Sequence, residues 1–166
     1  MIAGHSEYWS RRAYDAVQSW VDSGGQLVVA SGNTMFWRVS IEDGVIECRK
    51  LPNTVGGQAI HGVGELYHTH DHARGGLARE AGMPAWQATG LECIAYDGDP
   101  APFEVYDATH PFYTTPELVP VSDGDPLGGL LAVDHEYDVT LGQIANAPPA
   151  TAGYAPTVIA QGITNS

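Results

Sequence analysis

Apolar residues recur at helical spacing in the segment that follows Glu7. Between Tyr8 and Ser23 they fall at every third or fourth position, and most charged residues occupy the positions between them. This spacing places the apolar side chains on one buried stripe and predicts an amphipathic helix. Gly24 and Gly25 predict its end, because glycine readily adopts the left-handed conformation found at helix C-termini.

Short apolar runs predict strands around this helix. Residues 26–30 read Gln-Leu-Val-Val-Ala, a nearly continuous apolar run that is typical of a parallel strand covered on both faces. Residues 36–41 and 45–50 predict two more strands, and Asp43-Gly44 between them indicates a hairpin. Further expected elements are a long loop at 51–75, a short helix at 76–81, and strands at 91–96, 104–106 and 157–160.

The order of strand, helix and strand in the first half predicts an α/β fold. Ile2-Ala3 reads as the end of a further strand, so we expect an open, mostly parallel sheet of Rossmann-like type with a less regular, loop-rich second half. One α/β domain is expected over residues 1–160, followed by a tail at 161–166. Since a strand that feeds such a helix usually runs about five or six residues, we expect the chain to be a piece of a longer polypeptide.

The charge balance excludes several classes of function. The chain has 7 Lys+Arg against 20 Asp+Glu, a net charge of -13, whereas contacts to nucleic-acid phosphates need clustered Lys and Arg. No apolar run approaches the roughly 20 residues of a membrane span, and an anionic bilayer would repel the domain. Cys48 and Cys93 match no metal-binding spacing. We expect free thiols and hence a cytoplasmic protein.

Three polar residues follow the first two predicted strands. His5 and Glu7 lie between Ile2-Ala3 and the helix, and Asn33 lies in the turn after residues 26–30. Ligands of open α/β sheets bind outside the carboxyl ends of the strands, so we expect these three residues to line one cleft. The alternative for Glu7 is a purely structural role, because acidic groups favour helix N-termini.

A cluster of histidines offers a different site. His68, His70 and His72 alternate, so an extended segment would project all three side chains to the same side. Two histidines at this spacing can bind one metal ion, with a third ligand from His61 or Asp71. The alternative is a solvated polar loop whose histidines need no partner.

Four segments carry a family resemblance. They are Gly-His-Ser-Glu-Tyr-Trp at 4–9, Ser-Gly-Asn at 31–33, Gly-Gly-Leu at 75–77 and Asp-His-Glu-Tyr-Asp at 134–138. In this order they resemble the large subunit of N,N-dimethylformamidase, in its C-terminal region with a glutamine-amidotransferase-like α/β fold. The resemblance extends over residues 4–160.

The resemblance implies an amide hydrolase that acts on small N-substituted amides with a mononuclear ferric ion, Fe(3+), held by two tyrosines and a glutamate. Glu7 matches the glutamate ligand, and His5 matches a histidine beside it. Asn33 matches an asparagine that positions substrate or water, and Glu136 matches the carboxylate that takes the proton of the water. Ferric iron suits oxygen ligands, polarises an amide carbonyl and acidifies water.

In this family both tyrosine ligands precede the His-x-Glu segment, and only four residues precede His5 here. By the resemblance, this chain holds one ligand of three. We therefore expect an upstream domain or a small subunit to complete the site, and the full-length protein to be an oligomer. Two alternatives stay open. One is a non-catalytic amidotransferase-like module for assembly or small-molecule binding, and the other is a metalloprotein built on His68, His70 and His72.

Overall fold

The computed structural model describes residues 1–50, 63–68, 73–96, 101–128, 136–140 and 156–162. The chain divides into two compact units. The first comprises Met1–Ile94 and Asp138–Ala150, and the second comprises Ala95–Tyr137 and Thr151–Ser166. Within the described ranges, no helix is long and apolar enough to cross a membrane.

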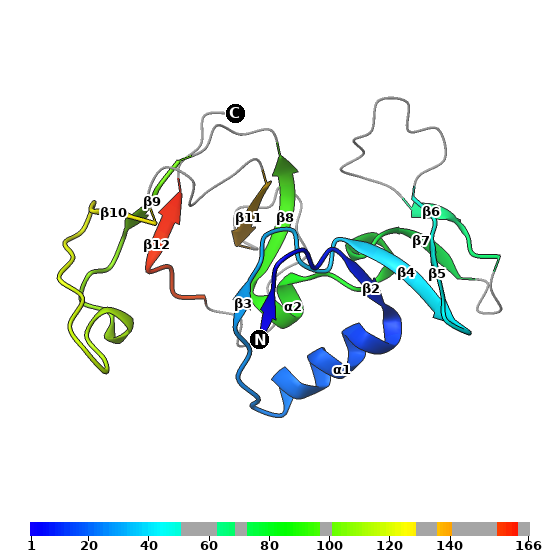
Figure 1. Ribbon diagram of the computed structural model, residues 1–166, viewed down its shortest axis with the longest axis horizontal. Helices are drawn as coiled ribbons and strands as arrows, with labels where there is room; N and C mark the ends of the chain where they lie inside the picture. Colours follow the sequence, from blue (N-terminus) through cyan, green and yellow to red (C-terminus); the bar gives the residue numbers. More distant parts are fainter. Residues whose placement is uncertain (51–62, 69–72, 97–100, 129–135, 141–155, 163–166) are drawn as a thin grey trace. The chain divides into compact units, whose positions relative to one another are not determined.

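Two parallel strand pairs open the first unit (Figure 1). β1 (Ile2–Ala3) pairs with β3 (Val29–Ala30), and β2 (Tyr8–Ser10) pairs with β4 (Trp37–Glu42). Helix α1 (Arg11–Asp22) connects the strands, which confirms the predicted helix except in its first turn. There the Ser10 side chain accepts a hydrogen bond from the Ala13 backbone N at 3.2 Å and caps the helix.

β4 belongs to a five-stranded sheet with the order β2-β4-β7-β6, in which β5 also pairs with β4. β5 (Val45–Cys48) runs antiparallel to β4, as the predicted hairpin requires. Asp43 and Gly44 at the turn have φ values of 48° and 78°. Positive φ at both central residues is the geometry of the tight turn for which Asp-Gly is favoured.

Two strands of this sheet lie where a long loop was predicted, so the prediction for 51–75 is wrong there. β6 (Val63–Leu66) and β7 (Arg74–Leu77) pair antiparallel. The sequence pattern did not indicate these two strands because both contain glycine, which is depleted in strands. A Cβ atom at Gly64 or Gly75 would overlap the Arg49 carbonyl oxygen, so glycine allows the close approach of neighbouring backbones.

The sheet connections overturn the predicted fold. The described strands form small sheets: a parallel pair of β1 and β3, a mixed five-stranded sheet, an antiparallel three-stranded sheet and the pair of β8 and β11. The α-helices among the described residues are α1 and the four-residue α2 (Trp86–Thr89). The protein is therefore not an open, mostly parallel sheet of Rossmann-like or glutamine-amidotransferase-like type. After β4 the chain returns through a tight hairpin, which makes an antiparallel neighbour, whereas a parallel neighbour needs a long crossover.

The remaining elements are short. The 3-10 helix η1 (Arg79–Ala81) stands where a short helix was predicted, and β8 (Leu91–Tyr96) confirms a predicted strand. β8 pairs with β11 (Glu136–Thr140), which the sequence did not predict. In the second unit, β9 (Phe103–Val105) pairs antiparallel with β10 (Pro126–Leu127) and β12 (Ala160–Gly162), and the 3-10 helix η2 spans Pro111–Tyr113.

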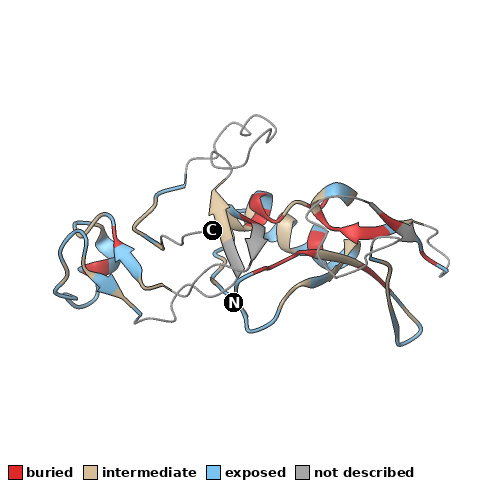
Figure 2. Ribbon diagram, turned by 90° about the horizontal axis from the view of Figure 1, so that it is seen from above, coloured by how far each residue is buried: buried red, intermediate tan, exposed pale blue. Residues whose placement is uncertain are grey.

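The larger core lies where α1 meets the segment before β8. Its buried residues gather in the first unit (Figure 2), and a partly buried Trp9 packs against them. The Tyr14 hydroxyl lies 2.9 Å from the Pro84 carbonyl oxygen and 3.0 Å from Gln87 Oε1. Burial raises the pKa of Tyr14, so this phenol stays neutral. The buried members of this cluster are Tyr14, Met35, Ala78, Met83, Ala85 and Ala88.

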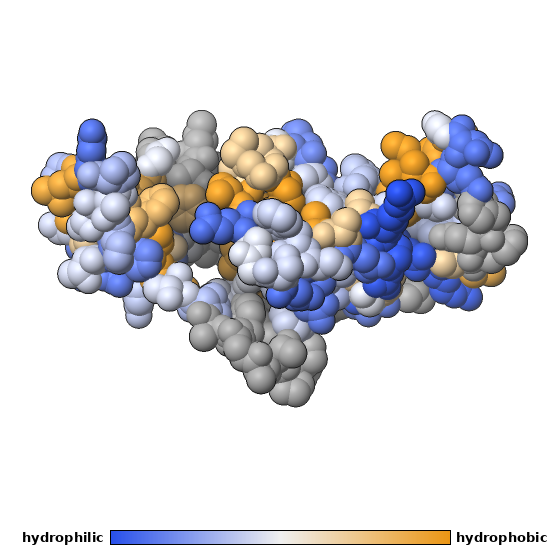
Figure 3. Space-filling model, turned by 90° about the horizontal axis from the view of Figure 1, so that it is seen from below, coloured by the Kyte–Doolittle hydropathy of each residue, from blue (hydrophilic) through white to orange (hydrophobic). Residues whose placement is uncertain are grey.

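A second cluster joins Phe36, Leu77 and Cys93. Cys93 is buried and Cys48 is partly buried, and both are free thiols, as expected. Some large apolar side chains stay on the surface. On the β4–β5 hairpin, Ile41, Val45 and Ile46 are 54%, 60% and 64% exposed. On the face shown in Figure 3, hydrophobic residues are interrupted by hydrophilic ones.

Glu92 is a charged group inside the first unit, with a side chain that is 3% exposed. Arg79 Nη1 lies 3.8 Å from Glu92 Oε1, and the Trp86 backbone N donates to Oε2 at 3.4 Å. Burial raises the pKa of Glu92 to about 7, although Arg79 and the backbone N–H groups act in the opposite direction. Arg79 also donates to the Cys93 carbonyl oxygen at 2.7 Å.

The raised pKa makes the stability of the fold depend on pH. The folded-state pKa of Glu92 lies above the ordinary value of 4.5, so its contribution is fully present below that value and is lost as pH rises through about 7. Glu92→Gln removes this titration. Between about pH 4 and pH 8, the variant should lose less unfolding free energy than the parent, by up to about 3 kcal/mol.

Urea unfolding at several pH values measures this difference. Glu80→Gln is the control, because Glu80 is an exposed acid of η1, and its pH profile should match that of the parent. Parallel profiles for Glu92→Gln and the parent would show that Glu92 does not titrate in this range.

Candidate functional site

Two loops run side by side from the carboxyl ends of β1 and β3. We call them the paired loops, residues 4–7 and 31–36. The Met35 backbone N donates to the Ser6 carbonyl oxygen at 3.0 Å, and the Trp37 backbone N donates to the Glu7 carbonyl oxygen at 2.7 Å. These bonds continue directly into the β2–β4 pairing. The fold therefore brings the two segments that hold His5, Glu7 and Asn33 together.

Three hydroxyl groups connect the paired loops. Ser6 Oγ lies 2.7 Å from Ser31 Oγ and 2.9 Å from Thr34 Oγ1. Ser31 Oγ donates to the carbonyl oxygen of Gly4, and a carbonyl can only accept. Because each hydroxyl has one proton, Ser6 donates to Ser31. The Thr34 hydroxyl has two acceptors within reach, Ser6 Oγ and the Ser31 carbonyl oxygen at 3.3 Å. We call this arrangement, from Thr34 through Ser6 and Ser31 to the Gly4 carbonyl, the hydroxyl chain.

His5 and Glu7 flank Ser6 and contact each other. His5 Nδ1 lies 3.1 Å from Glu7 Oε1. The His5 side chain is 94% exposed and that of Glu7 is 15% exposed. The carboxylate is therefore largely shielded from solvent, while the imidazole lies outside it. Such a contact can orient the carboxylate.

Asn33 is held at the other loop. It is 8% exposed and has a φ of 54°, in the left-handed region that asparagine tolerates better than most residues. Its backbone N donates to Asp138 Oδ1 at 3.4 Å. Glu136 is the first residue of β11, two positions before Asp138, and its side chain lies outside the described part of the structure. Sequence reasoning missed Asp138, although it ends the acidic segment 134–138.

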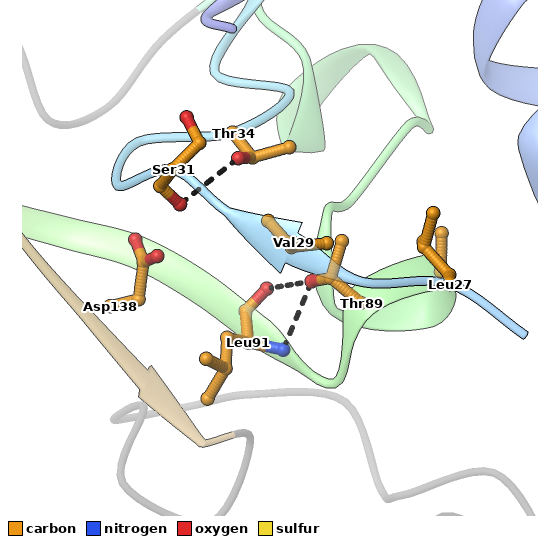
Figure 4. A pocket seen from close by; sticks show the side chains of 8 residues that line it. Leu27, Val29, Ser31, Thr34, Thr89, Leu91 and Asp138 are labelled. Carbon is orange, nitrogen blue, oxygen red and sulfur yellow. Dashed lines mark hydrogen bonds between the residues drawn. The ribbon is translucent and has the colours of Figure 1, made fainter. Parts of the chain in front are cut away.

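A pocket of about 190 Å³ adjoins the second loop. Both apolar and oxygen-bearing side chains line it, and Figure 4 shows Asp138 and Leu27 on opposite sides of the view, with Val29 between them. Ser31 and Asp138 belong to segments of the family resemblance, but the sequence predicted no site role for any residue of the lining. We call it the Asp138 pocket. Its lining residues are Leu27, Val29, Ser31, Thr34, Ala88, Thr89, Leu91 and Asp138.

The histidine-cluster hypothesis remains a prediction. His68 is exposed, and its backbone N donates to Glu47 Oε1 at 2.9 Å. His70, His72 and their suggested companions His61 and Asp71 lie outside the described residues. Among the residues that the structure does describe, no group of three or more His, Cys, Asp or Glu could hold a metal ion.

Comparison with known families decides the affiliation of the chain. The family described as N,N-dimethylformamidase beta subunit-like, C-terminal, matches residues 1–164. The chain belongs to this family. The resemblance read from the four sequence segments is thus confirmed over nearly the whole chain. No curated protein matches the sequence.

In this member of the dimethylformamidase beta subunit-like family, the hydroxyl chain should contribute measurably to stability. Ser6→Ala and Ser31→Ala each remove one hydroxyl and leave a polar neighbour without its bond, so each should lower the unfolding free energy by about 1 kcal/mol. The double variant should cost less than the sum, because the two residues share one hydrogen bond.

Chemical unfolding of the four proteins measures the coupling. Ser122→Ala, at an exposed serine, is the control and should change stability by less than about 0.5 kcal/mol. Additive effects of Ser6→Ala and Ser31→Ala would contradict the chain of bonds.

Proposed function

We propose that this chain supplies one side of the active site of an iron-dependent amide hydrolase that acts on small N-substituted amides. The observation that carries the proposal is the shielded Glu7 carboxylate beside His5, on a loop bonded to the Asn33 loop, in a chain that matches the N,N-dimethylformamidase beta subunit-like family over residues 1–164. Glu7, His5 and Asn33 are the residues expected at such a site from the family resemblance.

The donors of this chain fit part of an iron site. The Glu7 carboxylate offers oxygen, which a hard ferric ion prefers, and His5 Nδ1 at 3.1 Å can orient it. Among the described residues, no group of three or more His, Cys, Asp or Glu could hold a metal ion, and the family resemblance assigns the other two ligands to tyrosines. When bound, a ferric ion would polarise the amide carbonyl and lower the pKa of a water molecule.

The residues of the chain then have distinct roles. Glu7 would hold the metal ion, and His5 would donate its Nδ1 proton to Glu7 Oε1 and keep the carboxylate oriented. Asn33 would position the substrate or the attacking water through its side-chain amide. Glu136 would act as general base and accept the proton of that water. The hydrogen bond from the Asn33 backbone N to Asp138 Oδ1 at 3.4 Å supports the positioning role of Asn33, because it holds this loop in place.

The site requires partners. We propose that two tyrosine ligands come from an upstream domain or from a small subunit within an oligomer. The family description, beta subunit-like, supports a multi-subunit assembly. The exposed apolar side chains of Ile41, Val45 and Ile46 support contacts with further protein. The free thiols of Cys48 and Cys93 support a reducing compartment such as the cytoplasm.

On its own, this chain should bind ferric iron weakly and hydrolyse simple formamides slowly or not at all. One carboxylate and one histidine leave most coordination positions to water. Iron content and visible absorption of the purified chain measure this directly. Near-stoichiometric iron with a tyrosinate-to-iron charge-transfer band would show that the chain carries a complete centre.

In a polypeptide that unites this chain with the two tyrosine ligands, the two glutamates should behave differently. Glu136→Gln should keep the iron and lower turnover by roughly 10²–10⁴-fold, the usual contribution of a general base. Glu7→Gln should lose the iron, because the amide is a poor ligand for it. Glu80→Gln, which changes an exposed acid, should alter neither property.

Iron content and turnover are measured on the same preparations. Equal iron loss in Glu7→Gln and Glu136→Gln, or full activity in Glu136→Gln, would remove Glu136 from the mechanism. Retained iron in Glu7→Gln would remove Glu7 as a ligand.

A further inference from the structure

Ser6 stands between His5 and Glu7, and its side chain contacts the other of the paired loops. His5 Nδ1 lies 3.1 Å from Glu7 Oε1, whereas Ser6 Oγ lies 2.7 Å from Ser31 Oγ and 2.9 Å from Thr34 Oγ1. The contacts thus alternate along this segment, as side chains do in an extended chain. The two outer residues meet each other, and the middle residue meets the loop on the opposite side.

The backbone around Ser6 is also bonded on both sides. The Ser6 carbonyl oxygen accepts from the Met35 backbone N at 3.0 Å and from Trp9 Nε1 at 2.6 Å. The next carbonyl, that of Glu7, accepts from the Trp37 backbone N at 2.7 Å. The main chain that carries the Glu7 side chain therefore has defined neighbours, and the Ser6 hydroxyl adds a side-chain link to the second loop.

The Ser6 hydroxyl reaches both ends of the turn that holds Asn33. Asn33 lies between Ser31 and Thr34 and has a φ of 54°, and a residue in this left-handed conformation needs surroundings that hold it there. Thr34 Oγ1 also lies 3.3 Å from the Ser31 carbonyl oxygen, so the two ends of the turn contact each other (Figure 4). Ser6 therefore contacts a residue on each side of Asn33.

We propose that Ser6 is a positioning residue, whose hydroxyl sets the position of the Glu7 carboxylate relative to the side-chain amide of Asn33. Ser6 acts through these two residues and has no contact of its own with metal or substrate. The inference rests on the proposed function, in which Glu7 holds the iron and Asn33 positions substrate or water. It adds the group that keeps the two at a fixed separation.

The chemistry of the proposed site makes this separation matter. A metal ligand and a substrate-positioning group have to be held within about 0.5 Å of their productive geometry. Without the Ser6 hydroxyl, the backbone bonds of Met35 and Trp37 still pair the two loops, so the fold should persist. The Glu7 carboxylate would then occupy a wider range of positions, which weakens iron binding and makes the iron environment less uniform.

The first experiment measures hydrogen exchange in the metal-free chain. The backbone N–H groups of Met35 and Trp37 bond to Ser6 and Glu7, so their exchange rates report how firmly the paired loops hold together. Ser6→Ala should raise both rates about 5-fold, the effect of one lost hydrogen bond. Ser31→Ala should do the same, because it removes the acceptor of the Ser6 proton.

Tyr14→Phe is the matched control. It removes a hydroxyl of the same unit that lies 2.9 Å from the Pro84 carbonyl oxygen and 3.0 Å from Gln87 Oε1. The variant should lose a similar amount of stability, but it should change the exchange rates of Met35 and Trp37 by less than about 2-fold.

The second experiment uses the polypeptide that unites this chain with the two tyrosine ligands. Ser6→Ala and Ser31→Ala should each release iron to a chelator at least about 5-fold faster and broaden the ferric electron paramagnetic resonance signal. The double variant should add little, because the two residues share one bond. Tyr14→Phe should keep the parent rate and the parent spectrum, since a loss of stability alone does not change the iron environment in the folded protein.

Two results would overturn the proposal. Unchanged exchange of Met35 and Trp37 in Ser6→Ala would show that the hydroxyl does not hold the loops. Faster exchange with parent-like iron release and spectrum would show that Ser6 has a structural role only. A failure of the proposed function is distinguishable from both, because the parent would then hold no iron, or Glu7→Gln would retain it.

Discussion

Buried hydroxyl and backbone groups are costly unless they find partners, and in the first unit the paired loops supply partners to each other. Ser6 is the junction. Its side chain bonds to Ser31 and Thr34, and its carbonyl oxygen accepts from the Met35 backbone N at 3.0 Å and from Trp9 Nε1 at 2.6 Å. Ser6 thus connects both loops to β2, the strand that leads into α1. The parallel pairs β1–β3 and β2–β4 lie on either side of this junction.

Helix α1 connects the Ser6 region to the pocket through hydrogen bonds from Arg11 and Tyr14. Arg11 Nη2 donates to the Ala81 carbonyl oxygen at 2.8 Å, and its Nη1 donates to the Gly82 carbonyl oxygen at 3.1 Å. The hydroxyl of Tyr14 adds a contact to Pro84. These bonds hold the segment that leads into α2, and α2 contributes Ala88 and Thr89 to the pocket. The pocket walls are therefore set by packing against α1 rather than by the loops alone.

Asp138 links the candidate hydrolytic residues to the pocket. Its carboxylate accepts from Asn33, 105 positions earlier in the chain, and also faces the apolar walls. Glu7 and His5 therefore lie on one of the paired loops, and Asp138 of β11 is hydrogen-bonded to the other.

The sequence determined the elements whose signals are local. Helical spacing located α1, Asp43-Gly44 located the β4–β5 turn, and four short segments identified the family. The glycine-rich strands β6 and β7 carry no such signal. Gly64 and Gly75 allow the Arg49 backbone to approach closely, but glycine has a low strand propensity. The predicted parallel sheet was wrong because the β4–β5 hairpin and the antiparallel pairing of β7 with β4 and β6 make the five-stranded sheet mixed.

Only the tertiary structure decided which polar groups meet. The sequence offered His5, Glu7 and Asn33 as candidates, but the contact between Asn33 and Asp138 and the proton direction in the hydroxyl chain depend on loops brought together by strand pairing. Hydrogen bonds between residues distant in the chain produce no periodic pattern in the sequence, because each partner also fits the local backbone conformation in which it lies. Sequence alone thus gave the family and candidate residues, and folding gave their partners.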